Sequence, residues 1–352
     1  MASLKGTDKV LEKLKESVEN GNYYEAHQMY RTVCRRTYLS LRLVLLLCSE
    51  TSNKHLLYSG AQTLLKHKQT GSGVDLSLYL IDAYNDEEMA VNDESRARII
   101  QLLLLFPSDE PGRKRFIDSA VRASNHLHFS HISWSVKFGE NPAGDPELHH
   151  FVAELLYKDK MYSEAEPHFL AGTAESSKVY GRMLAEWSSQ DHPSKIGAYI
   201  ARAVLQYLCL RSIRDAKFAF ESFIADLTEK VPELKAGTAQ YNPTITGDAV
   251  DVTIYLLPLL NFLQLLILTV QREASDLFGE LRNRYKSVLS VEPSFEDLLN
   301  KIGEVFFNIR VQRPQQFNIF QDLVNSLFTS GPGTPSAGGT PYARVNPQGE
   351  LD

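Results

Sequence analysis

Apolar residues recur every three or four positions along most of the chain, which is the period of one face of an α-helix. The ranges that show this pattern are 10–30, 76–84, 97–105, 151–157, 198–210, 218–227, 256–270, 277–288 and 295–307. Signals for strands are few. In 244–255 the turn residues Thr246-Gly247-Asp248 separate two β-branched runs, which predicts a hairpin. The preceding stretch, 231–243, is predicted to be a loop.

A short pattern occurs twice, each time just after a polar turn. Tyr23-Tyr24-Glu25-Ala26 is followed by Tyr30, and Tyr162-Ser163-Glu164-Ala165 is followed by Phe169. In a helical hairpin, the small alanine lets two helices approach and the aromatic ring one turn later fills the space beside that contact. The pattern predicts an all-α, right-handed solenoid of tetratricopeptide-like helical hairpins with one small β-hairpin insertion. A plain helical bundle is the alternative.

Composition narrows the class of protein. The 352 residues carry a net charge of −6 with 43% hydrophobic residues, which is globular and gives no basic footprint for nucleic acid. Three scattered cysteines suit no disulfide framework, and the N-terminus lacks the apolar stretch of a signal peptide, so we expect a cytosolic protein. The tail at 330–352 is rich in Gly, Pro and Ser and is predicted to be disordered.

Signals for catalysis, cofactors, metals and membranes are weak. The longest apolar run, 256–270, contains a proline and two amides and is shorter than the roughly 20 residues of a membrane span. His126, His128 and His131 have no cysteine or carboxylate nearby in sequence, so a metal site is not expected. We therefore predict no enzyme activity, no cofactor and no membrane insertion.

One candidate binding surface is a basic ridge near the N-terminus. His27, Arg31 and Arg35 are spaced i, i+4 and i+8 on one helix, with Arg36 beside them and Lys13 on the preceding helix. In a net-acidic protein, this local positive charge is suited to an acidic partner surface. An ordinary solvated helix face is the alternative.

The second candidate surface is the helix predicted over 256–270. Its apolar residues cover almost the whole circumference, so it is either buried in the core or covered by another chain. The candidate contacts are Leu256, Leu260, Phe262, Leu263, Leu266 and Ile267, joined by Phe306 and Phe307. A groove that holds a partner segment and a plain core helix both remain open.

Several stretches together resemble one known family. They are 22–33 with its Tyr-Tyr-Glu-Ala-His-Gln-Met-Tyr-Arg run, 57–61, 68–76, 144–150, 162–170, 203–210 and 260–266. In this order they are similar to the Golgi-to-ER traffic protein 4 family, the scaffold subunit of the guided-entry pathway for tail-anchored membrane proteins. The likeness runs from about residue 10 to residue 328.

The resemblance implies a non-catalytic solenoid with two binding halves. The half at 1–150 would face the targeting ATPase, to which the basic ridge is assigned. The half at 151–329, with the hairpin, would hold the pathway's ubiquitin-like-domain subunit through the apolar residues named above. In animals the family also binds a BAG-domain protein of the pre-targeting complex. A helical-repeat adaptor of a vesicle coat or proteasome lid is the alternative function, and an enzyme on a helical scaffold is the third.

Two segments depart from the family's pattern. Residues 37–54 lack the expected start of a second repeat helix, and 123–133 interrupts an otherwise continuous match. Both resemble translated intron sequence or a lineage insertion, and we hypothesise a gene-model artefact. Sequencing the transcript tests this hypothesis, because both segments in mature message would contradict it. If 37–54 is genuine, it replaces part of the half that faces the ATPase.

Overall fold

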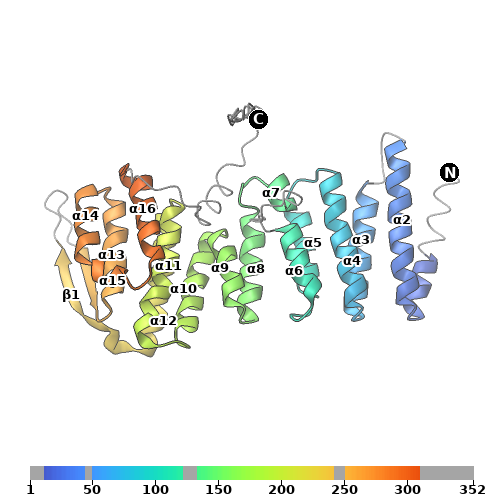
Figure 1. The fold of residues 1–352 in the computed structure, drawn as a ribbon. Coiled ribbons are helices and arrows are strands. Elements are labelled where there is room, and N and C mark those ends of the chain that lie inside the picture. The colour runs from blue at the N-terminus through green and yellow to red at the C-terminus, as the bar shows by residue number, and fades with distance from the viewer. Residues whose placement is uncertain (1–11, 44–49, 122–132, 242–249, 310–352) are drawn as a thin grey trace, which may run out of the picture.

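The computed structural model describes residues 12–43, 50–121, 133–241 and 250–309. Residues 12–19 form a helix. The following helices are α2 (Tyr23–Leu43), α3 (Glu50–Lys66), α4 (Thr70–Asp86), α5 (Asp93–Leu103), α6 (Pro111–Ala120), α7 (Trp134–Phe138), α8 (Pro146–Lys158), α9 (Tyr162–Leu170), α10 (Ala174–Ser188), α11 (Ile196–Cys209), α12 (Ile213–Lys230), α13 (Pro258–Gln271), α14 (Ser275–Arg284), α15 (Lys286–Leu289) and α16 (Ser294–Phe307). The helices lie side by side in one row, and a two-stranded sheet stands at the C-terminal end (Figure 1).

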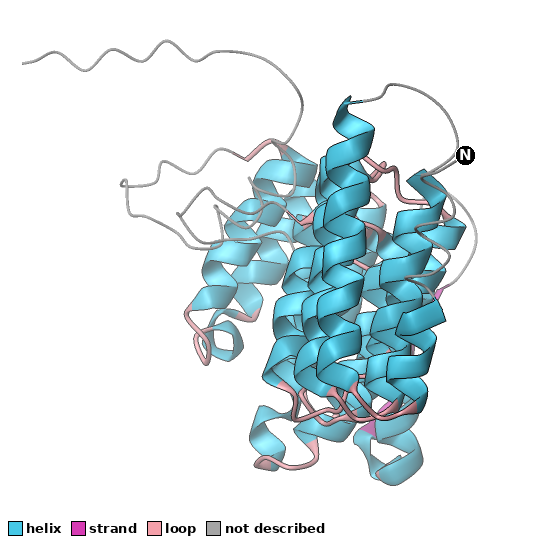
Figure 2. Cartoon of the chain, turned by 90° about the vertical axis from the view of Figure 1, so that its right-hand side faces the viewer, coloured by secondary structure: helices cyan, strands magenta, loops and turns pink. Residues whose placement is uncertain are grey.

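The row is a stack of antiparallel helical hairpins, so the predicted solenoid is confirmed. Consecutive helices such as α3 and α4, α8 and α9, and α11 and α12 pack directly against each other. Figure 2 looks along the row from the N-terminal end and shows the helices one behind another with nearly parallel axes. Each helix is therefore stabilised by its neighbours in the stack, as in other repeat proteins.

The repeated alanine–aromatic pattern has the predicted packing role. Ala26 and Ala165 are completely buried, so neighbouring helices approach them closely. A Cβ placed on Gly60 of α3 would lie 2.7 Å from the Tyr30 ring, which shows that the ring lies flush against that helix. The Phe169 ring stacks on Tyr180 of the next hairpin, with ring centroids 5.5 Å apart.

Helices α10 and α12 approach each other very closely. Ser177, Gly181 and Ala185 are buried along one side of α10. A Cβ on Gly181 would lie 2.2 Å from the carbonyl oxygen of Ala219 and 3.0 Å from the backbone nitrogen of Phe223. The absence of a side chain at 181 therefore sets the distance between these two helices.

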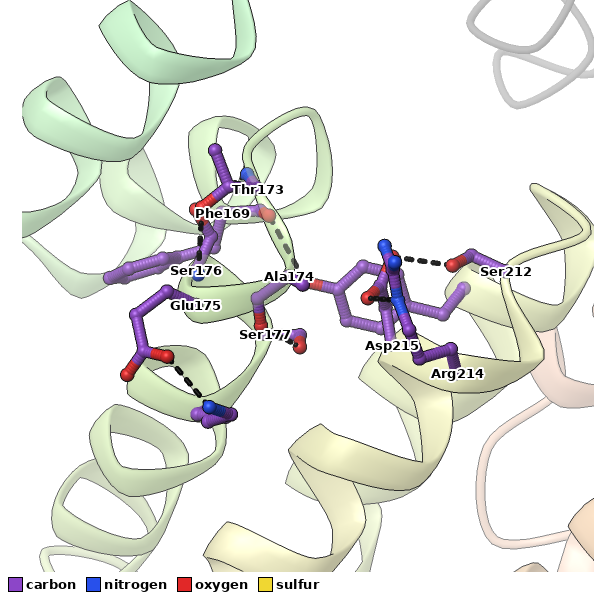
Figure 3. Close-up of polar contacts among 11 residues, drawn as sticks. Phe169, Thr173, Ala174, Glu175, Ser176, Ser177, Ser212, Arg214 and Asp215 are labelled. Carbon is purple, nitrogen blue, oxygen red and sulfur yellow. Dashed lines mark hydrogen bonds and ion pairs between the residues drawn. The ribbon is translucent and has the colours of Figure 1, made fainter.

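Polar contacts also satisfy the helix ends around α10 (Figure 3). Thr173 and Ser176 form a capping box at the start of α10, with the Thr173 amide donating to the Ser176 hydroxyl at 2.8 Å. The buried Tyr207 hydroxyl donates to the carbonyl oxygen of Phe169 at 3.0 Å, which joins α11 to the end of α9. Both contacts satisfy polar groups at helix ends that burial would otherwise leave unpaired.

Arginine–carboxylate pairs join helices of different hairpins. They are Arg96–Asp145 at 2.9 Å, Arg113–Asp159 at 2.6 Å and Arg202–Glu166 at 2.6 Å. Most of these side chains are largely buried, and breaking a buried pair leaves one charge without a partner. The pairs therefore favour one fixed arrangement of the hairpins.

Glu186 of α10 collects three donors from the neighbouring hairpin. The hydroxyls of Tyr157 and Tyr162 donate to its carboxylate at 2.7 and 2.8 Å, and the Lys160 ammonium pairs with it. These contacts, with the Lys160 hydrogen bond foremost, lower the pKa of Glu186 to about 2. The carboxylate is therefore ionised throughout the physiological range.

The predicted hairpin is present, but its first strand was misplaced. Strands β1 (Lys235–Tyr241) and β2 (Val250–Tyr255) pair antiparallel, with Thr238 opposite Thr253. Strand β1 lies inside the stretch predicted as a loop, because pairing with β2 imposes an extended conformation that its own residues do not signal. A one-turn helix, η2 (Pro232–Leu234), precedes it. The predicted turn at 246–248 lies outside the described residues.

The two segments that depart from the family pattern are only partly described. Residues 37–43 complete α2, 50–54 begin α3, and 44–49 lie outside the described part. Of 123–133 the structure describes Ser133, which precedes α7. The tail at 330–352 and the three histidines at 126, 128 and 131 also lie outside the described residues.

Candidate protein-binding surfaces

The basic ridge on α2 is partly paired within the chain. The Nε2 atom of His27 lies 2.8 Å from a carboxylate oxygen of Asp75 on α4, and only 10% of the His27 side chain is exposed. The Arg31 guanidinium pairs with the same carboxylate at 3.2 Å but remains 52% exposed. His27 therefore joins α2 to α4, whereas Arg31 presents charge to solvent.

The other cations of the ridge differ in what they offer. Arg35 and Lys13 are exposed. Arg36 lies in α2, and its side chain is outside the described part. Beside the ridge, α2, α3 and α4 enclose a cavity of about 590 Å³, which Arg31, Arg35 and Tyr79 help to line. Among the ridge side chains that the structure describes, those that present positive charge to solvent are Lys13, Arg31 and Arg35.

Two features of this surface were missed by sequence reasoning. Tyr24 is 76% exposed near the start of α2, outside the buried face that Ala26 and Tyr30 form. Asp75 lowers the net charge of the ridge. Sequence reasoning could not place it there, because it lies 48 residues from His27 along the chain.

Cys34 lines the same cavity. Burial raises the pKa of its thiol to about 12, so it is not a reactive thiolate.

Most of the predicted apolar contacts are core residues. Leu260, Phe262, Leu263 and Leu266 are completely buried, and Ile267 is 4% exposed. The cover comes from the chain itself, because α13 packs against α11, α12, α14 and β2. The neighbouring elements of the same chain therefore bury these five side chains, and a partner cannot reach them in this arrangement.

The remaining predicted contacts are accessible to different degrees. Leu256 is 62% exposed, whereas Phe306 and Phe307 are half-buried. The Phe307 ring packs on Phe278 with centroids 4.8 Å apart. Sequence reasoning missed Ile254, which lies on β2 two residues before Leu256 and is 42% exposed. We call Ile254 and Leu256 the hairpin-base patch.

A polar clamp fixes the hairpin-base patch to the solenoid. The Asn261 amide accepts from the backbone N–H of Tyr255 and donates to its carbonyl oxygen, both at 2.8 Å. The Tyr255 ring meets Phe220 of α12 edge-on, with centroids 6.3 Å apart. Because Tyr255 points into the core, its neighbours Ile254 and Leu256 point away from it.

The described residues offer little to a membrane or a metal ion. None of the helices there is long and apolar enough to cross a bilayer. The described part also holds no group of three or more His, Cys, Asp or Glu side chains placed to bind a metal ion.

The row of helical hairpins defines an α-helical repeat protein. It carries a cationic surface near one end and an apolar surface near the other. The profile of a family described as "GET4: Golgi to ER traffic protein 4" matches residues 51–328. The chain belongs to the Golgi to ER traffic protein 4 family, which confirms the resemblance seen in the sequence.

Individual relatives match over nearly the full chain. Golgi to ER traffic protein 4 of Aspergillus fumigatus is 32% identical, covering 96% of this chain and 94% of the relative. The homolog of Homo sapiens is 31% identical, covering 92% and 86%. The crystal structure of C. therm. Get4 superposes with a TM-score of 0.73 at 34% identity and covers 95% of this chain and 99% of that one.

Proposed function

We propose that this chain is a non-catalytic cytosolic scaffold in the targeting of tail-anchored membrane proteins to the endoplasmic reticulum. Its family supports a role in Golgi-to-ER traffic. In this proposal it bridges a ubiquitin-like-domain co-chaperone subunit and the targeting ATPase. The observation that carries the proposal is that exposed positive charge on α2 and exposed apolar side chains on the hairpin belong to elements at opposite ends of the row in Figure 1.

The N-terminal surface is proposed to bind the ATPase. Lys13, Arg31 and Arg35 provide exposed positive charge on neighbouring helices. Complementary charge speeds association and is screened by salt, so an acidic partner surface would bind here with a salt-dependent rate. Exposed Arg and Tyr side chains are also enriched among residues that dominate interface energies.

The C-terminal surface is proposed to bind the ubiquitin-like subunit. The hairpin-base patch exposes apolar side chains on a fixed support, and burying such surface stabilises a complex by roughly 25 cal/mol per Å² before the costs of association. Contacts of this kind depend little on salt. The subunit would therefore stay bound while the ATPase associates and dissociates.

The mechanism is proximity. Two partners held on one rigid stack meet at an effective concentration set by the geometry of the stack, without new contacts between them. The buried arginine–carboxylate pairs between hairpins keep that geometry fixed. No bond is made or broken by the scaffold itself.

Affinity purification with two pairs of matched variants tests the proposal. Arg35→Glu should weaken ATPase capture at low salt, and Arg284→Glu, the same change at an exposed site on α14, is its control. Leu256→Asp should release the ubiquitin-like subunit, and Leu104→Asp is its control because Leu104 is similarly exposed at 59%.

Each variant with its control tests one surface independently of the other. The proposal requires that Arg35→Glu keeps the ubiquitin-like subunit and that Leu256→Asp keeps the ATPase. Recovery of vesicle-coat or proteasome-lid subunits in place of these partners would support the alternative adaptor. Equal effects of each variant and its control would show that the named surfaces are not the binding sites.

A further inference from the structure

Among the described residues, the sheet at the end of the row has one free edge. Strand β2 packs against α13 as well as against β1, whereas β1 lies on the outer side of the hairpin (Figure 1). Residues 235–239 of β1 are all exposed. Alternate residues of an antiparallel strand direct their N–H and C=O groups away from the paired strand, so within the described part of the chain β1 presents a row of unpaired backbone groups.

This edge is protected against strand pairing at its start but not over its regular part. Exposed edges in other proteins carry charged side chains, prolines or short strands that discourage another strand from joining. Here Lys235 and a bulge stand at the start of β1, and the regular part, residues 237–241, contains neither a charge nor a proline. A two-stranded hairpin is also only marginally stable alone, so a third strand would add to its stability.

Gly237 gives the edge a defined side-chain preference. It pairs with Ile254, which is 42% exposed, and a Cβ placed on Gly237 would have no atom within 4 Å. A side chain on an added strand can therefore lie across the glycine and contact Ile254. Aromatic side chains beside a strand glycine stabilise sheets in this way. The same face continues to Leu256 in the hairpin-base patch.

We propose that β1 binds an extended segment of the C-terminal partner as a third strand, with an aromatic or large aliphatic side chain opposite Gly237. This inference rests on the proposed function, because it names how the partner of the hairpin-base patch is held. Backbone hydrogen bonds supply the pairing, and the open space over Gly237 sets the register.

Gly237→Phe tests the register. The introduced ring would itself cover Ile254 and occupy the space that the partner's side chain needs. We expect the Kd for the ubiquitin-like-domain subunit, measured by calorimetry, to rise about tenfold or more, the range of a hot-spot residue. Thr238→Val is the control, since Thr238 points to the opposite face and its change should leave the Kd within about twofold.

Amide hydrogen exchange of the full-length chain, with and without the same subunit, tests the strand pairing. Alternate amides in residues 237–241 should exchange about tenfold or more slowly in the complex. Binding with unchanged exchange in β1 would overturn the strand proposal and leave the proposed function standing. Failure of the subunit to bind would overturn both. Equal protection without the subunit at high protein concentration would show self-pairing of β1, which also contradicts this proposal.

Discussion

Gly181→Ala probes the tight contact between α10 and α12. The added Cβ would lie 2.2 Å from the Ala219 carbonyl oxygen and 3.0 Å from the Phe223 nitrogen, both backbone atoms of α12. No side-chain rotation relieves this overlap, so α10 and α12 must move apart. Helix α12 also packs against α11 and α13, and those contacts resist the movement.

The expected cost follows from two opposing effects. Overpacking of a tight core costs about 1–3 kcal/mol, and the backbone overlap places this site at the upper end of that range. Alanine is favoured over glycine in a helix by about 1 kcal/mol. The net loss in the free energy of unfolding should be about 2 kcal/mol.

Urea unfolding followed by circular dichroism measures this loss. Gly279→Ala is the matched control, because Gly279 is an exposed helical glycine whose added Cβ would have no atom within 4 Å. The control should gain about 0.5–1 kcal/mol from helix propensity alone. If Gly181→Ala were as stable as Gly279→Ala, the close approach of α10 and α12 would be refuted.

Three further changes test other parts of the fold. The folded-state pKa of Glu186 is about 2 and its ordinary value is 4.5, so its contribution to stability is present above pH 4.5 and is lost as the pH falls toward 2. Thermal unfolding of Glu186→Gln between pH 5 and pH 2 should therefore show a shallower pH dependence than that of the unchanged chain; parallel curves would contradict the predicted role. Leu263→Asp places a charge at a completely buried site and should lower stability by about 4 kcal/mol in urea unfolding, so wild-type stability would mean that this side chain is accessible. Tyr207→Phe removes the hydroxyl that donates to Phe169 and should cost about 1 kcal/mol in the same assay, whereas no change would imply that solvent replaces the bond.

The fold was predictable from the sequence where helices have large apolar residues on one face. The pattern at 295–307 matches α16, and that at 198–210 matches α11 within a few residues. Helix α10 was missed, although Val179, Tyr180, Met183 and Leu184 are buried on it. The side that faces α12 consists of small residues such as Ser177, Gly181 and Ala185. Hydrophobic periodicity cannot detect a face whose role is close approach.

The sites were less predictable, because burial depends on the rest of the chain. An apolar helix such as α13 gives the same signal whether its own chain or a partner covers it, and here its own neighbours cover Leu263. The basic ridge likewise gave no sign that Asp75 would pair with His27 and Arg31. Strand β1 was missed because its partner strand, not its composition, makes it extended.

The central claim is that one rigid stack binds two different proteins at the same time. Sedimentation velocity of the full-length chain mixed with the ubiquitin-like subunit and the targeting ATPase tests this claim most directly. The proposed scaffold predicts a ternary complex that sediments faster than either binary complex, and that loses only the ATPase when Arg35→Glu is used. Displacement of one partner by the other would contradict it.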